Sequence, residues 1–136
     1  MPPIAFKTIS INGDTIDFPK DFKNKYVLLD FWNLRCGPCV HEIKENYIDL
    51  FKRYTKEKFE IIGITNNSKN ELIDFLNSNQ IEWINIADKE GKRLIKLYDV
   101  YMYPTVFLIG PNGEIIHAEK DLRGQELRSI LENCLK

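Results

Sequence analysis

Two short runs of almost continuous apolar residues constrain the fold of this chain more than any other feature. One is YVLLDFW at residues 26–32, and the other is FEIIGIT at residues 59–65. Such runs are typical of strands that are buried on both faces of a parallel or mixed sheet. Charged residues between the runs, Glu42 among them, fall largely off one apolar helical face. That face consists of Val40, Ile43, Tyr47, Leu50, Phe51 and Tyr54.

The rest of the chain continues to alternate strands and helices. An alternating segment, a turn at NGD and a second segment predict an N-terminal hairpin within residues 5–18. Ser68 and Glu71 form a capping box for the next helix, and WINIAD follows as a short strand. TVFLIG and EIIHAE flank PNG as a closing hairpin before a last helix, which begins at about Gln125 and buries Cys134 among its apolar residues. The pattern predicts an α/β fold with a mixed central sheet flanked by helices.

Composition restricts the class of protein. Of 136 residues, 43% are hydrophobic, which supplies a packed core without disulfides or metals. The formal net charge of −1 argues against a nucleic-acid-binding protein. No apolar run approaches the roughly 20 residues of a membrane-spanning helix, and the N-terminus lacks a signal-peptide pattern. We find no repeat or linker and expect a single domain over residues 1–136.

Cys36 and Cys39, separated by Gly37 and Pro38, lie where the first apolar strand passes into the helix. A helix N-terminus stabilises negative charge, so the Cys36 thiolate, the reactive form of cysteine, is favoured there. Cys39 lies one turn later and is placed to close a disulfide with Cys36. The predicted chemistry is thiol–disulfide exchange, with Cys36 as the exposed nucleophile and Cys39 as the resolving thiol.

Two other interpretations of the cysteine pair are less favoured. A zinc site needs four ligands, and the remaining candidates His41, His117 and Cys134 are scattered along the sequence, so we expect no metal. A purely structural disulfide gains little stability from closing so short a loop.

Two segments resemble the thioredoxin superfamily, and the resemblance covers nearly the whole chain. VLLDFWNLRCGPC resembles the active-site segment of that superfamily, and YMYPTVFLIGPNGEI resembles its cis-proline segment. The hairpin extension at residues 1–25 and an inserted helix and strand at about residues 66–88 resemble the TlpA/ResA branch. The resemblance implies a thioredoxin fold, thiol–disulfide oxidoreductase activity without a cofactor, and work in the periplasm or cell envelope, with a cytoplasmic location left open.

The resemblance also implies roles for single residues. Asp30 matches the buried acid of the superfamily, as a proton acceptor for Cys39 or as a structural acid. The Tyr103–Pro104 bond matches the cis-proline, which turns the Tyr103 backbone towards a bound partner. Arg35 stands just before Cys36, where the superfamily usually carries a tryptophan. It either stabilises the Cys36 thiolate or contacts the partner protein. Gly37 and Pro38 are expected to contact the partner as well.

The predicted function is therefore reduction of disulfides in partner proteins by Cys36 and Cys39. We expect disulfide-containing protein substrates, a thiol electron donor, a monomer, and membrane attachment only through a tether outside this chain. Two alternatives stay open. One is a redox-responsive binding module without turnover. The other is a thiol peroxidase of the peroxiredoxin type, although Asn33 stands where that family usually carries Thr or Ser.

Overall fold

Five strands form one central sheet in the computed structural model, which describes residues 2–89, 92–119 and 122–136. Strand β3 is parallel to β4, and β4 is parallel to β5, whereas β6 is antiparallel to β3 and to β7. The mixed sheet predicted from the sequence is thereby confirmed. In spatial order the strands are β5 (Ile84–Ala87), β4 (Phe59–Thr65), β3 (Tyr26–Trp32), β6 (Thr105–Ile109) and β7 (Ile115–Glu119).

The N-terminal hairpin forms a separate two-stranded sheet. Its strands are β1 (Phe6–Ile9) and β2 (Thr15–Phe18), followed by the short 3₁₀ helix η1 (Lys20–Phe22). The Ile11 amide donates a hydrogen bond to the Asn85 carbonyl of β5, at 3.0 Å. The hairpin loop is therefore joined to the edge strand of the central sheet. The Phe18–Pro19 bond is cis, which the sequence analysis did not predict.

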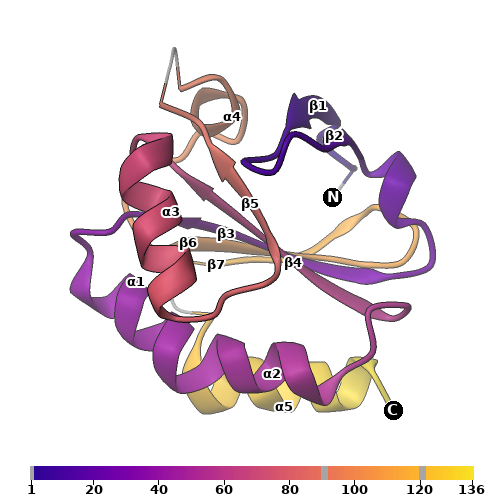
Figure 1. The fold of residues 1–136 in the computed structure, drawn as a ribbon. Helices are drawn as coiled ribbons and strands as arrows, with labels where there is room; N and C mark the ends of the chain where they lie inside the picture. The colour runs from indigo at the N-terminus through magenta and orange to yellow at the C-terminus, as the bar shows by residue number, and fades with distance from the viewer. Residues whose placement is uncertain (1, 90–91, 120–121) are drawn as a thin grey trace.

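The helices cover both faces of the sheet (Figure 1). The first helix runs without a break through α1 (Gly37–Glu42), the π-helical segment η2 (Ile43–Tyr47) and α2 (Ile48–Arg53). It lies with α5 (Gly124–Cys134) on one side, and α4 (Arg93–Leu97) lies with the hairpin on the other. The inserted segment predicted between β4 and the proline loop is present as α3 (Lys69–Ser78) and β5.

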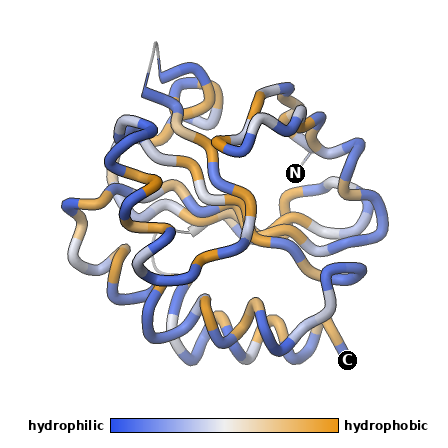
Figure 2. Tube along the Cα trace, in the orientation of Figure 1, coloured by the Kyte–Doolittle hydropathy of each residue, from blue (hydrophilic) through white to orange (hydrophobic). Residues whose placement is uncertain are grey.

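Strand β3 separates two apolar cores. Figure 2 shows hydrophobic residues along the central strands and along the helices. Leu28 and Trp32 belong to the core under the first helix, α3 and α5, whereas Leu29 and Phe31 belong to the core under the hairpin and α4. Because side chains alternate along a strand, Asp30 faces the first of these cores, which also contains Cys39. No helix in the described residues is long and apolar enough to cross a bilayer.

Three details differ from the sequence predictions. Glu42, expected off the apolar face of the first helix, is buried. Tyr54 lies just beyond that helix, which ends at Arg53. Cys134, expected to be buried, is only half-buried. Its thiol lies against the Tyr26 hydroxyl at the end of α5, and the pKa of Tyr26 is raised, first by burial and then by Cys134.

Candidate active site

Cys36 and Cys39 form a disulfide at the start of the first helix, with their Cα atoms 5.2 Å apart. Cys36 is the N-cap residue, and its Sγ accepts a hydrogen bond from the Cys39 amide at 3.2 Å. Cys36 is half-buried and Cys39 is buried. The sulfur nearer to solvent is thus the one aligned with the unpaired N–H groups of the helix start, where negative charge is stabilised.

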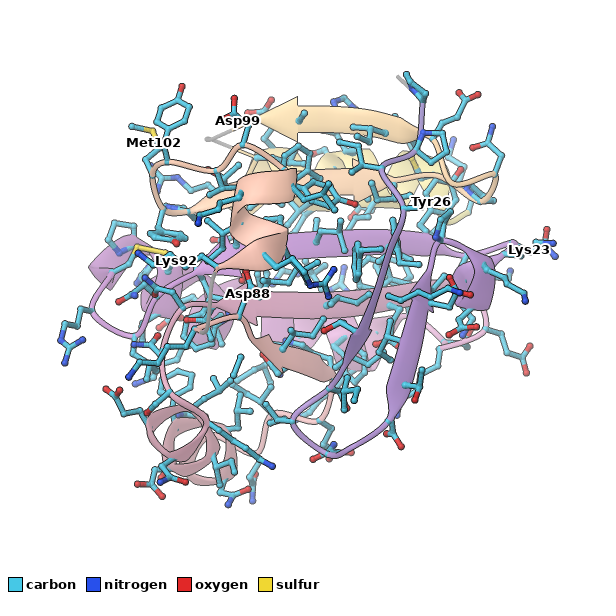
Figure 3. All side chains as sticks on the ribbon, turned by 90° about the horizontal axis from the view of Figure 1, so that it is seen from above. Lys23, Tyr26, Asp88, Lys92, Asp99 and Met102 are labelled. Atoms are coloured by element: carbon cyan, nitrogen blue, oxygen red, sulfur yellow. A yellow bond between two sulfur atoms is a disulfide. The ribbon has the colours of Figure 1, made fainter. Side chains whose placement is uncertain are left out.

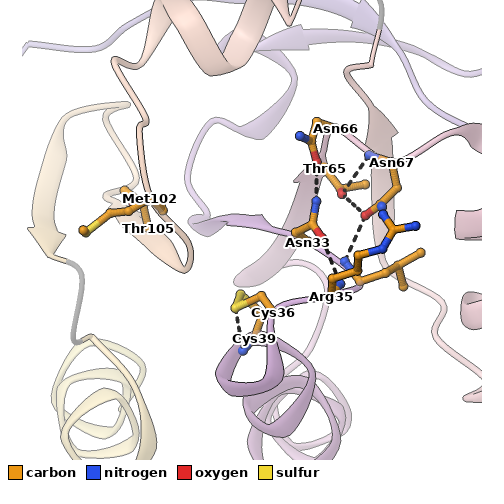
Figure 4. The surroundings of a disulfide bond; sticks show 10 residues. Asn33, Arg35, Cys36, Cys39, Thr65, Asn66, Asn67, Met102 and Thr105 are labelled. Carbon is orange, nitrogen blue, oxygen red and sulfur yellow. Dashed lines mark hydrogen bonds between the residues drawn. A yellow bond between two sulfur atoms is a disulfide. The ribbon is translucent and has the colours of Figure 1, made fainter.

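The surface beside the sulfurs is open. Gly37 and Pro38 are both exposed, and a Cβ at Gly37 would meet no atom within 4 Å. The Arg35 side chain is 81% exposed and lies 3.8 Å from the Glu71 carboxylate of α3. The Arg35 guanidinium is therefore drawn towards α3. In Figure 4 it lies on the side of Asn67, away from the sulfurs.

A network of polar side chains joins the loop before Cys36 to the loop after β4 (Figure 4). The Asn67 side-chain oxygen accepts hydrogen bonds from the Leu34 amide at 2.9 Å and from the Thr65 hydroxyl at 2.6 Å. The Asn33 side chain donates to the Asn66 side-chain oxygen. Bonds between residues 33 positions apart fix the active-site loop, and no local pattern in the sequence indicates them.

The Tyr103–Pro104 bond is cis, as the resemblance implied. The adjoining residues Met102 and Thr105 lie across from the disulfide in Figure 4, and the Thr105 hydroxyl donates to the Met102 carbonyl at 2.7 Å. The Tyr103 side chain is half-buried against both cores. Burial raises the pKa of Tyr103, with a smaller contribution from Asp88. The Tyr103 ring is thus partly covered by the two cores.

Asp30 is buried, with 2% of its surface exposed. Burial, followed by the negative charge of nearby Glu42, raises the pKa of Asp30 to about 8. Burial also raises the pKa of Tyr47, with further contributions from the charges of Asp30 and Glu42. A carboxyl group with this pKa exchanges a proton near neutral pH.

Glu42 is a second buried acid, which the sequence analysis did not assign to the site. Its Oε2 accepts hydrogen bonds from the Asn46 side chain and from the Gly124 amide, both at 2.8 Å. These bonds tie the first helix to the start of α5. Its spacing could have indicated that Glu42 lies near the site, because it is one turn beyond Cys39 on the same helical face.

Among the described residues, no three His, Cys, Asp or Glu side chains gather as ligands for one metal ion. Cys39 belongs to the core that Asp30 faces, and Cys36 packs at the edge of that core. Met102 and Thr105, on either side of the cis bond, lie across from the disulfide in Figure 4. This arrangement can exchange two electrons and one or more protons between the dithiol and a disulfide that docks on the open surface.

The comparisons with known proteins agree with this geometry. A model of the AhpC/TSA family matches residues 2–118. Thiol-disulfide oxidoreductase ResA of Bacillus thuringiensis subsp. konkukian is 32% identical over 133 residues, which are 96% of this chain and 73% of that protein. At this identity and coverage, this chain and ResA are members of one family.

Solved structures show the same fold. A thiol-disulfide oxidoreductase from Bacteroides fragilis has a TM-score of 0.82 at 24% identity, covering 96% of this chain and 97% of that one. A thiol:disulfide interchange protein from Chlorobium tepidum has a TM-score of 0.84 at 19% identity, covering 99% and 95%. The chain belongs to the AhpC/TSA family of thioredoxin-fold proteins, as a thiol–disulfide oxidoreductase related to ResA.

Proposed function

We propose that this chain reduces disulfides in partner proteins through Cys36 and Cys39. In the reduced protein the Cys36 thiolate attacks one sulfur of a partner disulfide, whose other sulfur leaves as a thiolate and takes up a proton. Cys39 then loses its proton and attacks the Cys36 sulfur of the mixed disulfide, releasing the second partner thiol. Two electrons pass to the partner, and the Cys36–Cys39 disulfide forms.

One observation carries this proposal. The Cys36 Sγ caps the first helix and accepts a hydrogen bond from the Cys39 amide. Hydrogen bonds to sulfur and the helix dipole favour the thiolate over the thiol, which lowers the pKa of a cysteine in this position. The partial exposure of Cys36 and the burial of Cys39 support the roles of nucleophile and resolving thiol.

Asp30 is proposed as the group that accepts the Cys39 proton. It faces the core that contains Cys39, and burial together with the charge of Glu42 raises its pKa to about 8, close to the ordinary value for a thiol. Proton transfer between groups of similar pKa is efficient. Glu42 is proposed to act through Asp30 as a positioning residue, since it adds negative charge beside that carboxyl group.

The partner is proposed to bind as an extended segment across the Tyr103–Pro104 backbone and the exposed surface at Arg35, Gly37 and Pro38. The exposure of these last three residues and the cis bond support this assignment. We further propose a monomeric single domain in the cell envelope, tethered if at all through a segment outside this chain and recycled by a thiol donor. The resemblance to the TlpA/ResA branch supports this setting.

Reduction of insulin with dithiothreitol as the electron donor tests the function. The wild-type chain should accelerate reduction, Cys36→Ser should abolish the acceleration, and Cys39→Ser should accumulate a mixed disulfide that mass spectrometry identifies. Equilibration in a redox buffer should give a reduction potential closer to that of thioredoxin, about −270 mV, than to that of the oxidant DsbA, about −120 mV. Binding without turnover would instead support a redox-responsive module, and rapid peroxide consumption would support a thiol peroxidase.

A further inference from the structure

A hollow of about 630 Å³ lies between the N-terminal hairpin, the start of α3, the end of β5 and the start of α4. We call it the basic groove, because Lys69, Lys89 and Arg93 line it together with Ile9, Ile11 and Asp88. A second hollow, of about 500 Å³, shares Ile9 and Arg93 with it and adds Lys7. The two hollows thus form one surface depression along strand β1.

The charge of the basic groove departs from that of the whole chain, which is −1. Lys7, Lys69, Lys89 and Arg93 are exposed, and no carboxylate of the described ranges lies within ion-pair distance of these four side chains. Asp88 is the single acid in the lining within those ranges. It is buried, and its Oδ2 accepts the Ile95 amide at 2.9 Å. The described part of the groove lining therefore carries an excess of positive charge.

The basic groove opens at the same edge of the sheet as the dithiol. Strands β3, β4 and β5 are parallel, and Trp32, Thr65 and Ala87 are paired across their carboxyl ends. Trp32 leads into the active-site loop, and Ala87 lines the groove. Asn67, whose side-chain oxygen accepts a hydrogen bond from the Leu34 amide, directly precedes Ser68, the N-cap of α3. A partner in the groove would therefore lie beside the loop that carries Cys36.

The boundary between the groove and the dithiol carries mixed charge. Glu71 lies in the first turn of α3, 3.8 Å from Arg35. The pKa of Glu71 is lowered, first by its hydrogen bond with Ser68 and further by Arg35 and Lys89. This carboxylate offsets the charge next to the dithiol, so the positive excess is concentrated on the hairpin side of α3.

We propose that the basic groove binds an acidic segment of the protein whose disulfide the dithiol reduces. The four cations complement carboxylates, and Ile9, which is 64% exposed, offers an apolar contact that a simple anion would not use. The groove would select among disulfides by their flanking charge and raise the rate of encounter. This inference rests on the proposed reduction of partner disulfides.

The test compares two synthetic peptides that carry the same disulfide, one flanked by Asp and Glu and the other by Ser and Gln. Reduced protein, freed of dithiothreitol, is mixed with each peptide, and the thiols are trapped by acid and alkylation in a single turnover. We expect the acidic peptide to be reduced about tenfold faster at low ionic strength. The ratio should fall towards one at about 0.5 M salt, because added ions screen exposed charges.

Charge reversal locates the effect. Lys69→Glu/Lys89→Glu should lower the acidic-to-neutral rate ratio about tenfold, and Lys69→Gln/Lys89→Gln should lower it by a smaller factor. The matched control is Lys23→Glu/Lys58→Glu, which changes the net charge equally. Both control lysines are exposed, and Figure 3 shows Lys23 at the end of the molecule opposite Met102. The control should leave the ratio within about twofold of the wild-type value.

A wild-type ratio near one that does not respond to salt would overturn the groove proposal and leave the proposed function intact. An equal loss of preference in the control and in Lys69→Glu/Lys89→Glu would also overturn it, because the effect would then come from net charge. If neither peptide were reduced, the proposed function itself would fail, and the groove proposal with it.

Discussion

At the scale of single residues, the ionisation of Asp30 controls a measurable property of the folded protein. Its carboxyl group is enclosed by apolar side chains and lies near a second acid, Glu42. Both the loss of water and the neighbouring charge favour the protonated form. Folding therefore holds a proton on Asp30 at pH values where the unfolded chain has released it.

The first prediction follows from the sign of that difference. The pKa of Asp30 is about 8 in the folded chain, against about 3.9 in an unfolded one. The contribution of Asp30 to stability is complete below about pH 4 and is lost as pH rises through about 8. The free energy of unfolding of the oxidised protein, measured with urea, should fall from about pH 5 to about pH 9, and Asp30→Asn should remove much of that slope.

Asp74→Asn is the control for this experiment, because Asp74 is an exposed acid on α3. Its pH profile should follow that of the wild type. A wild-type slope that persisted in full in Asp30→Asn would contradict the prediction, because it would show that Asp30 is not the source of the pH dependence.

The second prediction separates the two causes of the raised pKa. Glu42→Gln keeps the shape of the side chain and an oxygen that can accept from Gly124, but it removes the charge beside Asp30. The pKa of Asp30 should fall and yet stay above its ordinary value, because burial is the larger cause. Titration of a ¹³C-labelled aspartate carboxyl group by NMR measures this, and an unchanged midpoint would contradict it.

At the scale of secondary-structure elements, close packing over β4 requires a glycine at position 63. Gly63 is paired with Asp30 on one side and with Asn85 on the other. A Cβ at residue 63 would overlap the Asn85 side-chain oxygen and would come within 3.0 Å of Trp32 Nε1. The side chains of two neighbouring strands thus occupy the space that any larger residue would need.

The third prediction uses this contact. Gly63→Ala should lower the free energy of unfolding by about 1–3 kcal/mol, the usual cost of overpacking a core. Gly37→Ala is the matched control, because a Cβ at Gly37 meets no atom within 4 Å. That variant should be neutral or more stable by up to about 1 kcal/mol. Equal stabilities for the two variants would show that the layer over β4 can relax.

At the scale of the whole molecule, α5 closes the core beneath the sheet. Leu127 and Leu131 of this helix are fully buried. Arg128, on the same helix, donates to the Asp49 carboxylate of α2 at 2.8 Å across the surface. Apolar burial and a surface ion pair therefore join the same two helices, and their contributions differ in magnitude.

The fourth prediction compares the two. Leu131→Ala should lower the free energy of unfolding by about 2–5 kcal/mol, because it leaves a cavity in the core. Arg128→Ala should cost about 0.2–1 kcal/mol, as is usual for a pair that water screens. Guanidinium unfolding of both variants measures the difference. A larger loss from Arg128→Ala would mean that the ion pair, rather than the core, holds α5 in place.

Local sequence patterns predicted the parts of the fold that depend on neighbouring residues. Residues only a few positions apart determine these parts. They are the apolar runs at β3 and β4, the capping box at Ser68 and the turns of both hairpins. The family motifs predicted the cis bond at Pro104. The strands, the cap and the turns follow from the sequence alone because they depend on residues that are close along the chain. The cis bond follows from it because the family motif is recognisable.

Only the tertiary structure decided the environments of Glu42, Asn67 and Cys134. Glu42 is buried because α5 brings the Gly124 amide to its carboxylate, 82 positions away in the sequence. Asn67 holds the Leu34 amide across 33 positions, and Cys134 lies half-exposed beside Tyr26. The energy of a buried polar group depends on the partner that folding brings to it, and this partner is not encoded in the periodicity of the segment itself.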